Sequence, residues 1–176
     1  MAAQSDYLLN ETELNKLNGE KKIIHVYDWL QHLSKLLQKA EKVCSIIMIN
    51  LFAIHSFHLQ DDIKDIQKTL VDQLMKQLYS QNGNPSRRLI AKCLALIFNV
   101  GDTFLLFDTV NKFIDTLKNK DDSTSISNAK LSSIVCIGIM YENLGRLMGR
   151  TYEETVQLLL KLVKNADVNM NIHPIN

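Results

Sequence analysis

The chain has 176 residues, of which 46% are apolar and 22% are charged, a balance that excludes an extensively disordered protein. The net charge is only +1, so no strong electrostatic field is expected to attract nucleic acid or anionic lipid. Two prolines and six glycines are too few for the many turns of a β-sandwich or β-barrel. These features favour one helical domain with a substantial core.

Cysteine usage and the N-terminal residues indicate the compartment. Cys44, Cys93 and Cys136 are odd in number and lie in apolar, helix-like contexts. We therefore expect three buried, reduced thiols in a cytosolic protein. The first residues contain no basic stretch followed by an apolar one, so no signal peptide is expected.

Two helices are predicted in the N-terminal part of the chain. Residues 7–17 favour a short helix that Asn10 can cap with its side chain. Residues 21–39 show a clear helical spacing of apolar residues and predict a longer helix. The buried stripe of this longer helix is expected to contain Ile23, Tyr27, Leu30, Leu33 and Leu37, widened by Val26, Trp29 and Leu36.

Residues 43–59 form an apolar insert that shows no amphipathic period. Its length is at the short limit for a membrane span, and it contains His55 and His58. Three interpretations remain open. The segment is a buried or loosely packed helix, a membrane-spanning helix, or a piece foreign to the parent fold, such as an inserted exon.

Residues 61–80 predict a well-formed amphipathic helix. Three aspartates near its start lie where the helix dipole favours anions. Its buried stripe is expected to contain Ile63, Ile66, Leu70, Leu74 and Leu78, and its exposed face Lys64, Lys68, Asp72 and Lys76.

Residues 84–117 predict two strongly apolar helices joined by a very short turn at residues 99–102. Asn84 is expected to cap the first helix, and Gly101 to end it in a left-handed conformation. Asp102 or Thr103 can then cap the second helix. The expected inner residues are Leu89, Ile90, Cys93, Leu94, Leu96, Ile97 and Val100 in the first helix, and Leu106, Val110, Phe113, Ile114 and Leu117 in the second.

The C-terminal part of the chain predicts a polar loop over residues 118–128 and then two more helices. Gly138 lies inside the first of them, over residues 129–148, and predicts a close helix approach that offsets its helix-breaking tendency. A capping box at residues 151–154 opens the last helix, and residues 166–176 are expected to form an irregular tail. The inner face of the last helix is expected to contain Tyr152, Val156, Leu159 and Val163.

No strand is predicted, so the expected fold class is all-α. Helices as apolar as those at 84–117 need neighbours on more than one side, and antiparallel pairs of this kind build α-solenoids. We therefore predict that residues 1–176 form a single helical-repeat domain, an α-solenoid of antiparallel helix pairs like those of HEAT or armadillo proteins.

The sequence offers no convincing catalytic chemistry. His55 and His58 are three residues apart, but no further metal ligands follow at helical spacing. Arg87, Arg88 and Lys92 favour a solvated helix start over a phosphate site. We therefore expect a protein that is not an enzyme, without catalytic, cofactor-binding or metal-binding residues, and without a small-molecule substrate. No residue can be assigned to a protein-binding site.

The order of several segments resembles the N-terminal region of the HEAT repeat-containing protein 5 family. The strongest segments are Pro-Ser-Arg-Arg-Leu-Ile-Ala-Lys at 85–92 and Val-Gly-Asp-Thr-Phe at 100–104. The likeness covers residues 7–39 and 61–164. Further matching segments are 8–11, 28–30, 35–37, 67–74, 120–123, 129–131, 135–138 and 144–146.

The resemblance implies a non-enzymatic HEAT-repeat scaffold. Family members join aftiphilin and gamma-synergin, and they act with the clathrin adaptor complex in endosome-to-Golgi retrograde transport, endocytosis and protein localisation. By this likeness the chain is expected to be cytoplasmic and peripheral to the trans-Golgi network and endosomes. The insert at 43–59 departs from the family, whose members are also far longer, so the chain is expected to be an N-terminal fragment of a longer solenoid.

Two other functions remain open from the sequence. A membrane-associated helical protein would be anchored by residues 43–59. A generic helical-repeat module would bind a different client protein. The first alternative depends on the insert, and the second needs only the helical pattern.

Overall fold

The computed structural model describes residues 6–49, 57–80, 83–121 and 123–170, without the side chains of 44–49, 57–62, 150 and 165–170. Every regular element within these ranges is a helix, which confirms the predicted all-α class. In chain order the elements are α1 (Glu11–Leu14), α2 (Gly19–Ile49), α3 (Phe57–Tyr79), α4 (Asn84–Val100), α5 (Phe104–Lys118), α6 (Thr124–Leu144), the short 3-10 helix η3 (Gly149–Thr151) and α7 (Tyr152–Met170).

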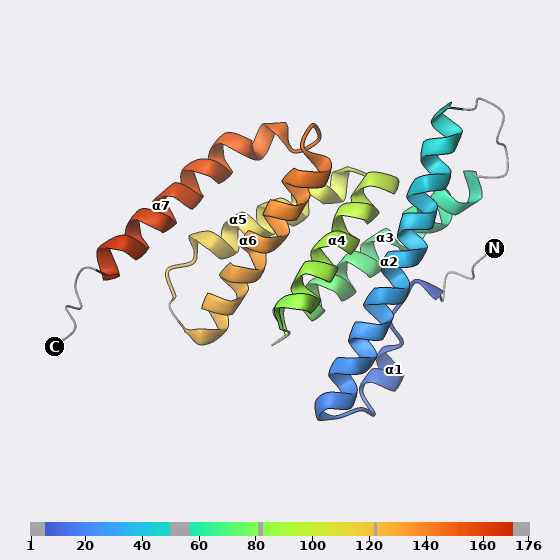
Figure 1. Ribbon diagram of the computed structural model, residues 1–176, viewed down its shortest axis with the longest axis horizontal. Helices are drawn as coiled ribbons and strands as arrows, with labels where there is room; N and C mark the ends of the chain where they lie inside the picture. The colour runs from blue at the N-terminus through green and yellow to red at the C-terminus, as the bar shows by residue number, and fades with distance from the viewer. Residues whose placement is uncertain (1–5, 50–56, 81–82, 122, 171–176) are drawn as a thin grey trace.

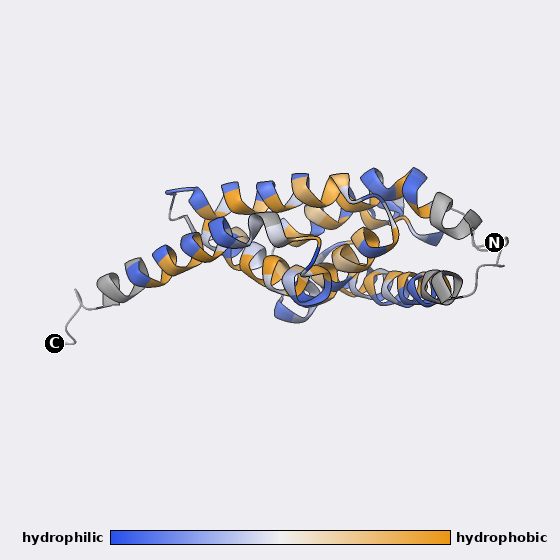
Figure 2. Cartoon of the chain, turned by 90° about the horizontal axis from the view of Figure 1, so that it is seen from above, coloured by the Kyte–Doolittle hydropathy of each residue, from blue (hydrophilic) through white to orange (hydrophobic). Residues whose placement is uncertain are grey.

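The helix α4 lies at the centre of the structure. It packs against α2, α3 and α6, and Figure 1 shows α2, α4 and α6 side by side. The next helices along the chain, α3, α5 and α7, run back in the opposite direction. α5 packs on α6, while α7 contacts α5 and η3 and extends away from the other helices (Figure 2).

The buried stripe follows the predicted helical period in α3 and is shifted in α2. In α3 all five predicted inner residues are buried, and all four predicted outer residues are exposed. In α2 the stripe is displaced because Ile23 is 52% exposed, so its prediction as an inner residue is wrong. The buried positions of α2 are Val26, Trp29, Leu30, Leu33, Ser34, Leu37 and Ala40.

The apolar insert at 43–59 is divided between two helices. Residues 43–49 belong to α2 and residues 57–59 to α3, which run in opposite directions (Figure 1). Residues 50–56, which include His55, lie outside the described residues, as do the side chains of Cys44 and His58. None of the helices within the described ranges is both long and apolar enough to cross a membrane.

The segment before α2 covers one side of α2 and α3. The predicted helix over 7–17 is reduced to α1, which Asn10 caps as predicted by accepting a hydrogen bond from the Glu13 N–H at 3.2 Å. Gln73 on α3 binds both backbone groups of Leu9, each at 3.0 Å. The Trp29 indole N–H donates to the Tyr7 carbonyl at 3.1 Å. These bonds hold an irregular segment that could not be recognised by helical spacing.

The ends of α4 differ from the prediction. Gly83, not Asn84, is the N-cap, and no side chain caps the helix there. Gly101 ends α4 with φ −94° and ψ −149°, so the predicted left-handed conformation is wrong. Asp102 contributes to the start of α5 as predicted, since its carboxylate accepts the Phe104 N–H at 2.9 Å, whereas Thr103 makes no side-chain cap.

A buried glutamine fixes the turn between α4 and α5. Gln67 on α3 is 1% exposed, donates to the Asp102 carbonyl at 2.8 Å and accepts from the Asp102 N–H at 2.6 Å. A Cβ at Gly101 would overlap the Gln67 side-chain oxygen and lie 2.9 Å from the Ile97 carbonyl oxygen. Glycine is therefore needed here for the close approach of Gln67, not for a left-handed backbone.

The helix α6 begins earlier than predicted. Ser123 caps it by accepting the Ile126 N–H at 3.4 Å, so the predicted polar loop at 118–128 is shorter, and its last residues are helical. Gly138 is exposed, and a Cβ there would meet nothing within 4 Å. The predicted close helix approach at Gly138 is therefore wrong.

The start and the inner face of α7 also differ from the prediction. The capping box does not form, because the Thr151 hydroxyl donates to the Met148 carbonyl at 2.9 Å and Glu154 binds Lys118. Tyr152 and Val163 are exposed instead of buried. The inner side contains Thr155 with Leu158, Leu159 and Leu162. Because α7 continues to Met170, the predicted irregular tail at 166–176 is helical over its first five residues. From residue 171 onward this tail lies outside the described residues.

Candidate interaction surface

The described cysteine thiols are buried, whereas the basic side chains of Arg88 and Lys92 are exposed to solvent. Cys93 and Cys136 are buried as predicted, and desolvation raises the pKa of each thiol from 9.0 to about 12. The Cys93 thiol donates to the Leu30 carbonyl at 3.8 Å. Among the described residues, no three histidine, cysteine or acidic side chains lie together to hold a metal ion. Arg88 and Lys92 are exposed on α4.

We expect Cys93 and Cys136 to resist thiol reagents in the native protein at pH 8, because only the thiolate reacts rapidly. As the pH rises from 9.0 toward about 12, unfolded thiols ionise while the folded thiols stay neutral, so stability falls. The measurement is labelling kinetics in a Cys44→Ser background, with and without urea. Rapid native labelling of either cysteine would contradict the buried placement.

Contacts with α5 and α6 fix the orientation of α7. Lys118 on α5 binds the Glu154 carboxylate at 2.8 Å, and this hydrogen bond raises the pKa of Lys118. The Tyr141 hydroxyl lies 2.9 Å from the Thr151 hydroxyl and donates to Thr155 at 3.2 Å. The ring of Tyr141 also meets that of Tyr152 edge to face, with centroids 5.7 Å apart. These contacts turn Thr155 inward, so the exposed residues Gln157, Lys161 and Lys164 lie on the opposite, outward side of α7.

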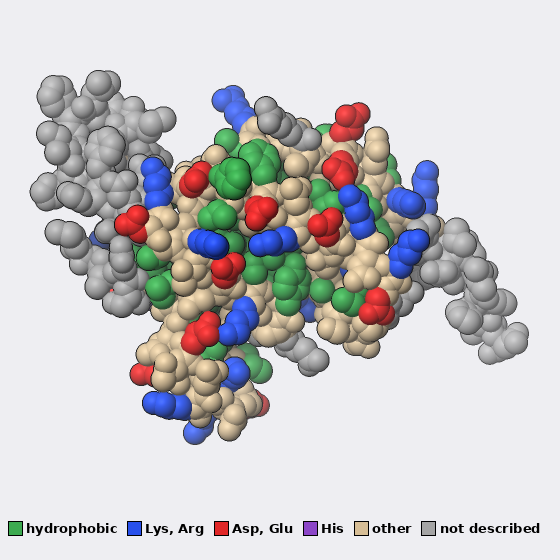
Figure 3. All heavy atoms as spheres, turned by 180° about the vertical axis from the view of Figure 1, so that it is seen from behind, with side chains coloured by type: hydrophobic (Ala, Val, Ile, Leu, Met, Phe, Trp, Pro, Cys, Tyr) green, Lys and Arg blue, Asp and Glu red, His purple; other side chains and the backbone are tan. Residues whose placement is uncertain are grey.

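The flank of α7 between its inner and outward sides carries a line of exposed apolar residues. Tyr152, Leu160 and Val163 are 59%, 56% and 58% exposed, and Val156 between them is half-buried. Their spacings of four, four and three residues place them on one helix face. We call these four residues the α7 stripe. Figure 3 shows that hydrophobic side chains are also exposed on the rear surface, with charged side chains among them.

The apolar surface of α7 is therefore wider than its packed side. Leu158, Leu159 and Leu162 belong to the inner side, while the α7 stripe lies on the neighbouring flank, where Leu160 and Val163 are exposed. A helix with this pattern is typical of an internal position in a stack, and an exposed apolar stripe is typical of a protein-binding surface. Periodicity indicated apolar residues on α7, but it could not show which part of this surface packs on α5.

No protein-family model matches the chain, and no solved structure matches it. The fold and the surface thus define an all-α protein of packed helices whose last described helix exposes an apolar stripe.

Proposed function

We propose that the chain is a non-enzymatic α-solenoid scaffold of the HEAT type that acts in clathrin-adaptor-dependent vesicle trafficking. The observation that carries the proposal is the arrangement of the helices. α2, α4 and α6 lie side by side, and each is followed by a helix that runs back. Stacks of this kind expose extended surfaces for protein partners and need no chemistry of their own.

The resemblance to the HEAT repeat-containing protein 5 family falls on residues that determine the fold. Trp29, Gln67, Gln73 and Gly101 all belong to the matching segments. Trp29 and Gln73 hold the N-terminal segment, and Gln67 and Gly101 form the turn between α4 and α5. Their role in tertiary contacts supports a shared fold, because such residues are hard to replace without loss of packing.

The proposed partners are aftiphilin, gamma-synergin and the clathrin adaptor complex. We infer that the α7 stripe is part of the surface that binds these partners, because it is exposed apolar area next to the packed side of α7. By this proposal the protein is cytoplasmic and bound peripherally to the trans-Golgi network and endosomes, where it serves retrograde transport, endocytosis and protein localisation.

Carbonate extraction of membranes tests the mode of membrane association. A peripheral scaffold is expected to co-fractionate with Golgi and endosomal membranes and to be released into the supernatant at alkaline pH. Retention in the membrane pellet would support the alternative of an anchor at residues 43–59, an apolar segment that α2 and α3 share.

A further inference from the structure

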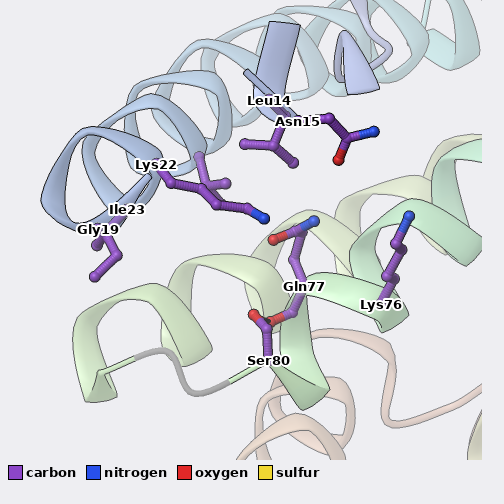
Figure 4. A pocket seen from close by; sticks show the side chains of 9 residues that line it. Leu14, Asn15, Gly19, Lys22, Ile23, Lys76, Gln77 and Ser80 are labelled. Carbon is purple, nitrogen blue, oxygen red and sulfur yellow. Dashed lines mark hydrogen bonds between the residues drawn. The ribbon is translucent and has the colours of Figure 1, made fainter. Parts of the chain in front are cut away.

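A cavity of about 390 Å³ opens where the turn between α1 and α2 meets the C-terminal end of α3 (Figure 4). Its inner wall includes the apolar side chains of Leu14 and Val26, each 3% exposed. Ile23 lines the cavity as well and is 52% exposed. The cavity is of a size that accepts a ligand group, and the side chains of Leu14, Val26 and Ile23 give it an apolar part that favours a hydrophobic one.

The polar lining of this cavity combines two lysines with the neutral side chains of Asn15, Gln77 and Ser80. Lys22 on α2 and Lys76 on α3 line it, and no acidic residue does. Lys22 extends across the cavity toward Gln77 (Figure 4). Lys76 already holds a carboxylate, since its ammonium lies 3.0 Å from Glu11, which is outside the lining. The cavity begins at Gly19, the first residue of α2, where the helix dipole adds positive potential.

We propose that this cavity binds a short linear peptide in which an apolar anchor residue is flanked by acidic residues. The anchor side chain contacts Leu14, Val26 and Ile23, and an acidic residue of the peptide pairs with Lys22. The charge of Lys22 favours an acidic partner, and the exposed Ile23 provides apolar area that binding covers. This site is separate from the α7 stripe and does not depend on the trafficking role.

The test uses a fluorescein-labelled peptide with one phenylalanine flanked by aspartates, and fluorescence anisotropy as the readout. Lys22→Glu and Ile23→Asp are each expected to weaken binding by about tenfold, which corresponds to 1.4 kcal/mol. The matched controls are Lys21→Glu and Ile24→Asp, because both residues are exposed neighbours on α2 that do not line the cavity. These controls are expected to change affinity by less than about twofold.

Four outcomes would overturn the proposal. The first is that the peptide does not bind, and the second is that Lys21→Glu weakens peptide binding as much as Lys22→Glu does. The third is an unchanged affinity when alanine replaces the phenylalanine of the peptide. The fourth is that the protein binds inorganic phosphate or phosphatidylserine vesicles more tightly than the peptide and needs Lys22 to do so. Circular dichroism of each variant shows whether it keeps the helical fold. Because all four substituted positions are exposed or at the cavity rim, folded variants are expected.

Discussion

Replacing Leu94 with alanine is expected to lower the free energy of unfolding by about 2–5 kcal/mol. Leu94 is fully buried in α4, and α4 packs against α2, α3 and α6, so the surrounding helices cannot collapse easily into the space left by the side chain. The measurement is urea unfolding followed by circular dichroism.

Leu96 provides the control for this prediction. It lies two residues further along α4, and the sequence pattern predicts it as an inner residue, but it is only half-buried. Leu96→Ala is therefore expected to cost clearly less than Leu94→Ala, and Lys92→Ala at the exposed face is expected to cost almost nothing. Equal losses at Leu94 and Leu96 would contradict the orientation of α4.

Replacing Gly101 with alanine is expected to destabilise the protein by about 1–3 kcal/mol. The new Cβ would overlap the Gln67 side chain and disturb its two hydrogen bonds to Asp102. Hydrogen exchange at the Asp102 amide is expected to become faster in this variant. The cost of Gly101→Ala is expected to shrink in a Gln67→Ala background, because the overlapping group is then absent.

The same substitution, glycine to alanine, should have the opposite effect on stability at Gly138. Gly138 lies inside α6, and a Cβ there would meet no atom within 4 Å. Gly138→Ala is therefore expected to stabilise the protein by about 0.5–1 kcal/mol, the usual difference between the two residues inside a helix. Destabilisation at Gly138, or no cost at Gly101, would show that the two glycines have been assigned the wrong roles.

The helical spacing of apolar residues predicts most of the fold, because this spacing arises where one face of a helix packs on its neighbours. It identifies the buried stripes of α3 and α5 correctly. It fails where the apolar surface of a helix is wider than its packed side, as in α7, since spacing alone cannot show which part has a neighbour. It also fails at the start of α2, where Ile23 continues the stripe in sequence but lies beside a cavity.

Contacts between segments that are far apart in the chain could not be predicted from the sequence. Gln67 and Gln73 look like ordinary polar residues of an amphipathic helix, yet each binds backbone groups of another segment. Likewise, residues 151–154 have the spacing of a capping box, but the box does not form. The Thr151 hydroxyl binds the Met148 carbonyl instead, and Glu154 binds Lys118. Local motifs fail in these places because a tertiary partner competes for the same polar groups.

The most direct test of the proposed scaffold is the affinity of the purified protein for purified aftiphilin and gamma-synergin. Binding is expected for the native chain and for Ile24→Asp, a surface control that is 57% exposed. Leu160→Asp changes a residue of the α7 stripe that is 56% exposed, and it is expected to weaken binding by about tenfold with unchanged helix content. Absence of binding to both partners, or an equal loss with Leu160→Asp and Ile24→Asp, would contradict the account.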